Sequence, residues 1–170
     1  ATAAVEQTAA ALAAVRSLAE AEFADAGWFA PVDLADLVEA AVAAETRRAD
    51  VAVEILAPEG GGAPPVLWAA GVQLAVANLV RNAVVHGRPT DPGGPARLVV
   101  TVGTDPAGGP TVTVDDNGPG IHPADRARVV ERFERGSRAP GSGLGLAIAR
   151  QVAMAHGGSL AIDDSPLGGA

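Results

Sequence analysis

The sequence predicts an α+β two-layer sandwich, in which a mixed sheet carries about three helices on one face. Strand and helix patterns alternate in a mixed order along the 170 residues. The two clearest strands, within 96–116, are joined by the loop DPAGGP as an antiparallel hairpin, which a parallel doubly wound sheet fits less well. Apolar residues make up 48% of the chain but aromatic residues only 3%, so we expect a core of small aliphatic side chains.

The N-terminal part of the chain is expected to contain two helices and two strands. Residues 1–26 are alanine-rich, with apolar residues at helical spacing, and favour a helix that leads in from an upstream domain; a frayed tail is the alternative. A short strand within 28–34 is followed by Asp33, whose side chain can cap a helix that starts at Leu34. The alternating run 51–57 predicts a second strand.

The remaining elements follow from the same patterns. Apolar residues at helical spacing predict a long helix over 69–86, which a proline- and glycine-rich break separates from the hairpin. Beyond the hairpin, residues 117–143 are predicted to be mostly loop, interrupted by a short helix near 123–133. A helix over 144–156 and a strand over 159–164, with the sequence SLAIDD, complete the prediction.

The composition excludes several classes of protein. All twelve basic residues are arginine, and a chain without lysine cannot form a Walker P-loop, a protein-kinase fold or a pyridoxal-phosphate Schiff base. The absence of cysteine excludes disulfides, thiolate nucleophiles and cysteine-ligated zinc. A formal net charge of −8 argues against a nucleic-acid partner, because binding DNA phosphates requires a dense cationic surface. No apolar run in the sequence reaches the length of a membrane span.

Three polar side chains share one stripe of the helix over 69–86. Asn78, Asn82 and His86 stand four residues apart in NLVRNAVVHG, so they lie on the same helix face. A carboxamide oxygen on a half-buried helix is a suitable ligand for Mg²⁺, a hard cation that bridges phosphates. The alternative is that both asparagines cap loops or bond the backbone from the helix flank, and the motif taken alone favours this alternative.

The stretch VDDNGPGI, residues 114–121, combines a carboxylate with two glycines directly after a strand. Asp116, Gly118 and Gly120 permit a tight turn and a close approach of the backbone to a ligand. A buried carboxylate at this place could accept a hydrogen bond from an exocyclic amine such as that of adenine. The alternative is an ordinary Asn-Gly turn without a ligand, and the motif taken alone favours it.

Glycines also precede the helix over 144–156. Gly141, Gly143 and Gly145 alternate with other residues in GSGLGLAI, where free N–H groups and the helix dipole can bind an anion without a lysine. The spacing differs from the Gly-x-Gly-x-x-Gly of dinucleotide-binding folds, and it follows a loop instead of a strand. Taken alone, these glycines do not identify a nucleotide.

In combination and in this order, four motifs point to a family. NLVRNA, DNGPG, ERFERG and GSGLGLAI resemble the N, G1, F and G2 boxes of sensor histidine kinases, in the ATP-binding catalytic domain with the Bergerat fold. The stretch HGGSLAI also resembles the closing helix and strand of these domains. The resemblance covers about residues 28–169. It implies a catalytic domain over 27–170 that binds ATP and Mg²⁺, with an ATP lid at about 121–142.

The resemblance implies a role for residues in each motif. Asn82 would be the Mg²⁺ ligand and, with Arg132 and Arg135 of the lid, would act in catalysis. Asp116 would be the carboxylate that selects adenine. The rest of the nucleotide site would comprise Asn78, His86, Gly118, Gly120, Ile121, Phe133, Gly141, Gly143, Leu144, Gly145 and Leu146.

The resemblance also implies an activity and partners. The domain would transfer the γ-phosphoryl group of ATP to a histidine on a separate dimerisation and phosphoacceptor domain of the same protein, which then passes it to a response regulator. Residues 1–26 would lead in from that missing domain, and the family's last strand would be truncated after LGGA. The full-length protein would be a membrane-anchored homodimer of bacteria, and this part of it would be cytoplasmic and by itself monomeric.

Two positions depart from the family pattern. The family usually has a lysine or arginine three residues after the magnesium-binding asparagine, where this chain has Val85. Either a lid arginine or Arg88 would then supply the phosphate contact, or the affinity for phosphate would be lower. Gly87 stands where the family usually has a serine or threonine.

One residue separates a kinase from the ATP hydrolases of the same fold. In gyrase B and MutL a glutamate one turn before the magnesium-binding asparagine activates water, whereas Asn78 stands at this position and an amide cannot take a proton. His86, His122 and His156 lack the setting of a phosphoacceptor, so the chain is not expected to phosphorylate itself. An anti-sigma-type protein serine kinase and a non-catalytic ATP-sensing module are the alternatives.

Overall fold

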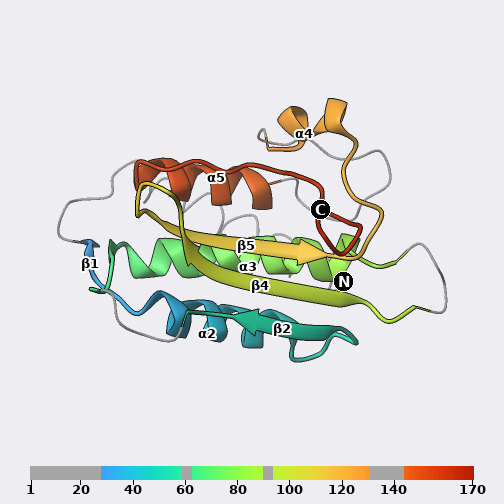
Figure 1. The fold of residues 1–170 in the computed structure, drawn as a ribbon, viewed down its shortest axis with the longest axis horizontal. Helices are drawn as coiled ribbons and strands as arrows, with labels where there is room; N and C mark the ends of the chain where they lie inside the picture. Colours follow the sequence, from blue (N-terminus) through green and yellow to red (C-terminus); the bar gives the residue numbers. More distant parts are fainter. Residues whose placement is uncertain (1–27, 59–62, 90–93, 131–143) are drawn as a thin grey trace, which may run out of the picture.

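The computed structural model describes residues 28–58, 63–89, 94–130 and 144–170. They form two layers, a three-stranded sheet and a layer of three helices on one of its faces (Figure 1). A fourth, short helix, α4 (Pro123–Val129), stands apart from both layers. The α+β sandwich expected from the sequence is thereby confirmed. The expected lead-in helix, 1–26, lies outside the described residues.

The sheet is mixed, as predicted. In spatial order its strands are β2 (Ala52–Leu56), β4 (Arg97–Thr104) and β5 (Pro110–Asp116). β4 and β5 form the expected antiparallel hairpin, whereas β2 runs parallel to β4. Leu98, Val100 and Val102 of β4 are buried, because alternate residues of a strand point to the same face. Since parallel strands need a crossover connection, the segment between β2 and β4 must cross the sheet, and it contains the helix predicted over 69–86.

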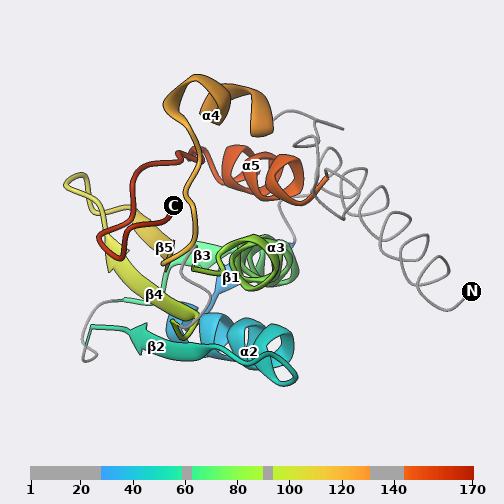
Figure 2. The ribbon, with the colours of Figure 1, turned by 90° about the vertical axis from the view of Figure 1, so that its right-hand side faces the viewer.

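The helices lie side by side over the sheet, with the crossover helix in the middle (Figure 2). They are α2 (Leu34–Thr46), α3 (Ala69–His86) and α5 (Gly145–Ala155). Asp33 caps α2 as predicted, since its Oδ1 accepts hydrogen bonds from the N–H groups of Ala35 at 2.9 Å and Asp36 at 3.2 Å. Val38 of α2 and Val80 of α3 are fully buried and belong to the same apolar cluster as the valines of β4. This packing holds α3 against the sheet and between the two outer helices.

Arg81 connects α3 to α2 at the surface. Its guanidinium donates hydrogen bonds of 2.9 and 2.7 Å to the two carboxylate oxygens of Glu45. Hydrogen bonding to Glu45 raises the pKa of Arg81 above its ordinary value, although burial alone would lower it. The arginine within NLVRNA is therefore held toward α2 and leaves the opposite side of α3 to the two asparagines.

A second apolar cluster joins the start of α3 to α5. Its buried members are Trp68, Leu144, Ile148 and Val152, and Phe29 packs against it. His156, at the end of α5, closes this cluster. Its Nε2 accepts a hydrogen bond from the N–H of Trp68 at 3.0 Å, and its Nδ1 lies 2.8 Å from the carbonyl oxygen of Val152. Since Nε2 accepts, the ring proton must be on Nδ1, and the imidazole satisfies an N–H at the start of α3. This histidine is therefore a structural residue.

The strand predicted over 159–164 is wrong. SLAIDD alternates as a strand does, but this segment forms no ladder with another described strand. The backbone bonds to the end of β5 come from residues further along the chain. The N–H of Asp116 donates to the carbonyl oxygen of Ala170 at 3.0 Å, and the N–H of Gly169 donates to that of Asp116 at 3.1 Å. An alternating pattern shows which face would be apolar, but a strand also requires a partner along its length.

A small second sheet was not expected. The strand β1 (Ala30–Pro31) lies within the predicted strand 28–34, and it pairs antiparallel with β3 (Val66–Leu67). Two residues are too few to show the alternation by which a strand is recognised in a sequence. This pair lies next to the start of α3, where the N–H of Val32 also donates to the carbonyl oxygen of Pro65 at 3.0 Å.

Candidate nucleotide-binding site

The two asparagines of α3 face the start of α5. If Gly145 carried a Cβ atom, this atom would lie 3.2 Å from Oδ1 of Asn78 and 3.6 Å from both amide atoms of Asn82. The structure thus brings both asparagines of NLVRNA against Gly145, although 66 residues lie between Asn78 and Gly145 in the chain and 62 between Asn82 and Gly145. Because Gly145 has no side chain, the amide groups of both asparagines come close to the first turn of α5.

The two asparagines differ in their surroundings. Asn78 is buried, with 7% of its surface exposed, and its Nδ2 donates a hydrogen bond of 2.9 Å to the carbonyl oxygen of Leu74. This is the backbone bond that the sequence left open as an alternative, and it leaves the Asn78 oxygen directed at α5. Asn82, one turn further along, is half-buried. Of the two, Asn82 has the more open side chain.

The first turn of α5 is the next part of the candidate site. The helix starts at Gly145, and the residue before it, Leu144, makes no side-chain cap hydrogen bond. The N–H groups at such a helix start have no partner within the helix, and the helix dipole adds partial positive charge there. The side chain of Leu144 is buried in the cluster around Trp68, so it does not line an open site. This geometry suits an anion such as a phosphate.

Asp116 ends β5 and is held by backbone N–H groups. Its Oδ1 accepts hydrogen bonds from the N–H groups of Gly118 at 2.9 Å and Ala170 at 3.4 Å. Within the described part of the chain, both hydrogen bonds to this carboxylate fall on Oδ1. The other oxygen, Oδ2, is then the acceptor that a ligand's amino group can use. The carboxylate is therefore fixed in orientation before any ligand arrives.

Three glycines pack closely around Asp116. A Cβ atom on Gly87 would lie 2.7 Å from Cβ of Asp116, and one on Gly169 would lie 2.1 Å from its Oδ1. A Cβ atom on Gly118 would lie 2.5 Å from the Cα atom of Gly87. The departure from serine or threonine at position 87 has a physical reason here, since a side chain would collide with the carboxylate. Gly87 and Gly169 were not expected in the site from the sequence, because a contact between distant glycines leaves no local pattern.

Gly87→Ala should lower the free energy of unfolding by about 2 kcal/mol, because the new methyl group overpacks a filled site. Its Cβ would meet the carbonyl oxygen of Ala83 at 2.4 Å as well as Asp116. The backbone at Gly87, with φ of −79°, suits alanine, so the cost is steric alone. Urea unfolding would measure it, with Gly158→Ala as control, since the nearest atom there is 3.4 Å away. Equal unfolding midpoints for the two variants would contradict the crowding inferred here.

The other residues expected in the site are placed as follows. Gly120 has a positive φ of 68°, which favours glycine, and a Cβ atom there would lie 3.1 Å from the carbonyl oxygen of Gly169. The carbonyl oxygen of Ile121 accepts a hydrogen bond from a side chain of α4. His86 is exposed at the end of α3, and Leu146 is half-buried in the first turn of α5. The positions Arg132, Phe133, Arg135, Gly141 and Gly143 lie outside the described residues.

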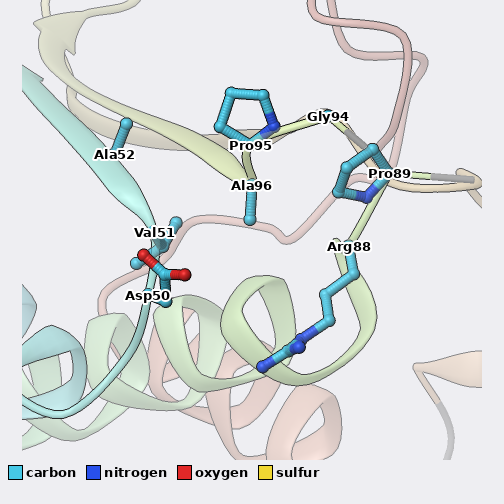
Figure 3. Close-up of a pocket in the computed structure, with 8 residues that line it drawn as sticks. All are labelled: Asp50, Val51, Ala52, Arg88, Pro89, Gly94, Pro95 and Ala96. Atoms are coloured by element: carbon cyan, nitrogen blue, oxygen red, sulfur yellow. The ribbon is translucent and has the colours of Figure 1, made fainter. Parts of the chain in front are cut away.

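A separate hollow of about 560 Å³ lies beside the end of α3 (Figure 3). Arg88 lines it, together with residues before and at the starts of β2 and β4: Asp50, Val51, Ala52, Pro89, Gly94, Pro95 and Ala96. Asn78, Asn82 and Asp116 are not among its lining residues. Val85 is exposed. The position of Arg88 in this other hollow therefore gives no support to the alternative in which it replaces the cation missing at Val85.

Comparison with known proteins gives consistent results. A family model described as "Histidine kinase-, DNA gyrase B-, and HSP90-like ATPase" matches residues 69–170. The sensor-type histidine kinase PrrB of Mycobacterium tuberculosis is 38% identical over 161 residues, which are 94% of this chain and 34% of PrrB. The signal transduction histidine-protein kinase/phosphatase MprB of Mycobacterium ulcerans is 40% identical over 148 residues, which are 82% of this chain and 26% of MprB. The chain thus spans about a third or less of these relatives.

Solved structures of the same two kinds of kinase are similar in fold. The mycobacterial sensor histidine kinase MprB superposes with a TM-score of 0.67 at 33% identity, over 79% of this chain and 85% of that one. The ATP-binding domain of PrrB from Mycobacterium tuberculosis has a TM-score of 0.62 at 34% identity, over 83% of this chain and 90% of that one. The chain therefore belongs to the histidine kinase-, DNA gyrase B- and HSP90-like ATPases and, among them, to the ATP-binding domains of sensor histidine kinases.

Proposed function

We propose that this chain binds ATP and transfers its γ-phosphoryl group to a histidine on a separate domain of the same protein, which passes the group to a response regulator. The observation behind this proposal is that α3 contacts both other parts of the candidate site: its two asparagines lie against Gly145 of α5, and Gly87 at its end lies against Asp116. The relatives in the comparisons, which are sensor histidine kinases, support the same activity.

Asp116 would recognise the base. Its Oδ1 is engaged by N–H groups of Gly118 and Ala170, so Oδ2 would accept a hydrogen bond from the exocyclic amine of adenine. Guanine presents a carbonyl oxygen at the equivalent position, which a carboxylate repels. The proposal thus explains selection of adenine by a fixed acceptor rather than by the size of the pocket.

The phosphates would lie at the start of α5 and beside Asn82. No group of three or more histidine, cysteine, aspartate or glutamate side chains within the described ranges could hold a metal ion by itself. The half-buried Asn82 fits Mg²⁺ as a single oxygen donor, with phosphate oxygens and water as the other ligands. Bound Mg²⁺ would neutralise charge on the phosphates during transfer. The first turn of α5 would add N–H donors, and Arg132 and Arg135 of the lid positive charge.

Phosphoryl transfer is favoured over hydrolysis by Asn78. Its amide is buried and donates to a backbone carbonyl, so it cannot remove a proton from water. The acceptor would lie outside this chain. His122 accepts the N–H of Ala124 at the start of α4, and His156 is bonded to Trp68. These contacts give both histidines a local structural role.

The chain would be part of a larger protein. We infer that the full-length protein is a membrane-anchored homodimer, with this part in the cytoplasm, next to a dimerisation and phosphoacceptor domain. Among the helices of the described residues, none has the length and apolarity needed to cross a membrane. The alternatives, an anti-sigma-type serine kinase or a non-catalytic ATP sensor, are not favoured, since the curated relatives are sensor histidine kinases.

A labelling experiment tests the proposed function. With radiolabelled ATP and Mg²⁺, the 170-residue chain alone should remain unlabelled, because none of its three histidines is placed as an acceptor. Addition of the phosphoacceptor domain of the same protein should give label on that domain, and removal of Mg²⁺ with a chelator should abolish it. Label on this chain alone, or none on the added domain, would overturn the proposal.

A further inference from the structure

We propose that Arg126 of α4 is a positioning residue for the base-selecting carboxylate. This inference rests on the proposed function, because it assigns Arg126 to the site around Asp116. Arg126 lies ten residues further along the chain and makes no contact with Asp116 itself among the described interactions. Its effect would be exerted through the two backbone segments that hold Asp116.

Arg126 links two segments with one guanidinium. Its Nε donates a hydrogen bond of 3.0 Å to the carbonyl oxygen of Ile121, in the chain that leaves the DNGPG turn. One terminal nitrogen pairs with the carboxylate of Asp164, and the other lies 3.8 Å from Oδ1 of Asp163. The Arg126 side chain is 18% exposed, whereas both aspartates are more than 80% exposed. A planar guanidinium buried in this way holds its partners in a fixed geometry.

The first of these segments runs from Asp116 to Ile121. Gly118 donates its N–H to the Asp116 carboxylate, and Gly120 adopts the left-handed conformation that turns the chain toward Ile121. Arg126 holds this segment through its hydrogen bond to the carbonyl oxygen of Ile121. The turn that carries a donor to Asp116 is thus anchored at its far end.

The second segment runs from Asp163 to Ala170. The N–H of Ser165 donates to the carbonyl oxygen of Gly169 at 3.1 Å, and the N–H groups of Gly169 and Ala170 donate to the backbone and side-chain oxygens of Asp116. This is the region in which the predicted strand is absent, so no sheet ladder holds residues 159–164. The ion pair of Asp164 with Arg126 holds this segment in place, whereas strand pairing does not.

Together the contacts form a closed ring that begins and ends at Asp116. The two segments approach each other at Gly120, where a Cβ atom would lie 3.1 Å from the carbonyl oxygen of Gly169. Arg126 closes the ring on the side away from the carboxylate. Without it, the second segment can move relative to the first, and one N–H donor to Asp116 moves with it. The carboxylate would then lose part of its fixed orientation.

The test is nucleotide selectivity measured on the 170-residue chain. Arg126→Gln should weaken binding of Mg·ATP by about tenfold in calorimetry and reduce the preference for ATP over GTP. Asp164→Asn, a change at an exposed residue, should weaken ATP binding by about threefold, because the other contacts of Arg126 remain. The double variant should bind ATP no more weakly than Arg126→Gln alone, since both substitutions remove the same interaction between Arg126 and Asp164.

Two further variants control for other effects. Arg126→Lys keeps the charge but not the planar fork, and should restore only part of the affinity. Arg48→Gln removes an exposed arginine just beyond the end of α2 and should bind ATP like the unchanged chain. If Arg126→Gln does not fold, Asp164→Asn and Arg126→Lys still decide the question by their selectivity.

Three outcomes are informative about which proposal fails. If Asp116→Asn loses ATP binding but Arg126→Gln and Asp164→Asn retain wild-type affinity and selectivity, only the role of Arg126 is overturned. If Arg126→Gln lowers the free energy of unfolding without changing selectivity, Arg126 is structural and the inference is wrong. If Asp116→Asn itself binds ATP normally, the base-recognition site of the proposed function fails first.

Discussion

Asp116→Asn should weaken ATP binding by about a hundredfold or more, because only one of the two polar atoms of an asparagine amide can accept a hydrogen bond. Oδ1 accepts hydrogen bonds from Gly118 and Ala170, and in the proposed site Oδ2 would accept one from the amino group of adenine. If the asparagine oxygen takes the place of Oδ1, its NH₂ group meets the amino group of the base, donor against donor. If the amide is turned over, its NH₂ group meets two backbone N–H groups instead. Isothermal titration calorimetry with Mg·ATP would measure the loss.

The neighbouring carboxylate provides the control for this substitution. Asp115→Asn makes the same change in charge and volume one residue earlier, in the strand β5. Because adjacent residues of a strand point to opposite faces, Asp115 does not share the setting of Asp116. ATP affinity in Asp115→Asn should stay within about twofold of the unchanged chain, because this side chain lies on the other face of β5. Similar losses in the two variants would show that net charge, and not base recognition, controls binding.

Asn82→Ala should reduce phosphoryl transfer to the phosphoacceptor domain by about a hundredfold to a thousandfold, the range seen when a transition-state contact is removed. The substitution removes the oxygen donor that faces the start of α5. Adenosine, which carries no phosphate, should bind as before, because Asp116 is unchanged. The measurement is the initial rate of label transfer at saturating ATP, over a range of Mg²⁺ concentrations.

Two further variants make this result specific. Asn82→Asp keeps an oxygen ligand for Mg²⁺, so its transfer rate should exceed that of Asn82→Ala. Gln73→Ala removes an exposed carboxamide from the same helix, and should transfer at the rate of the unchanged chain. If Asn82→Ala transferred phosphate as fast as Gln73→Ala does, the assignment of the metal ligand would have to be abandoned.

Much of the fold could be predicted from local patterns. The bounds of α3 agree with the predicted range, and Asp33 caps α2 through the two N–H groups that a capping residue serves. The hairpin of β4 and β5 was predicted because a short loop joins two alternating runs. These features depend on residues close together in the chain. For that reason a single sequence is sufficient to predict them.

The features that could not be predicted depend on distant partners. The segment 159–164 has the alternation of a strand but no described partner, and β3 has a partner but is too short to alternate. The parallel pairing of β2 with β4 is likewise invisible in either strand alone. Local patterns describe what a segment is suited to form, and the neighbours brought by folding decide what it does form.

The candidate site was predicted in its parts rather than in its assembly. Asn78, Asn82, Asp116 and Gly145 were each singled out from motifs, and the structure brings both asparagines against Gly145. The crowding of Gly87 and Gly169 against Asp116 could not be foreseen, because it arises where three separate segments meet. The roles of the lid residues from 131 to 143 stay predictions, since these residues lie outside the described part of the chain.

The position of α3 has a thermodynamic consequence. This helix is the crossover between two parallel strands, the middle member of the helix layer and the element that carries both asparagines. A site on such a helix cannot melt locally while the rest of the domain stays folded. Any ligand held by α3 therefore adds its binding free energy to the cooperative unfolding of the whole domain, by RT ln(1 + [L]/Kd). In this fold, the occupancy of the nucleotide site and the free energy of unfolding of the whole domain are therefore thermodynamically linked.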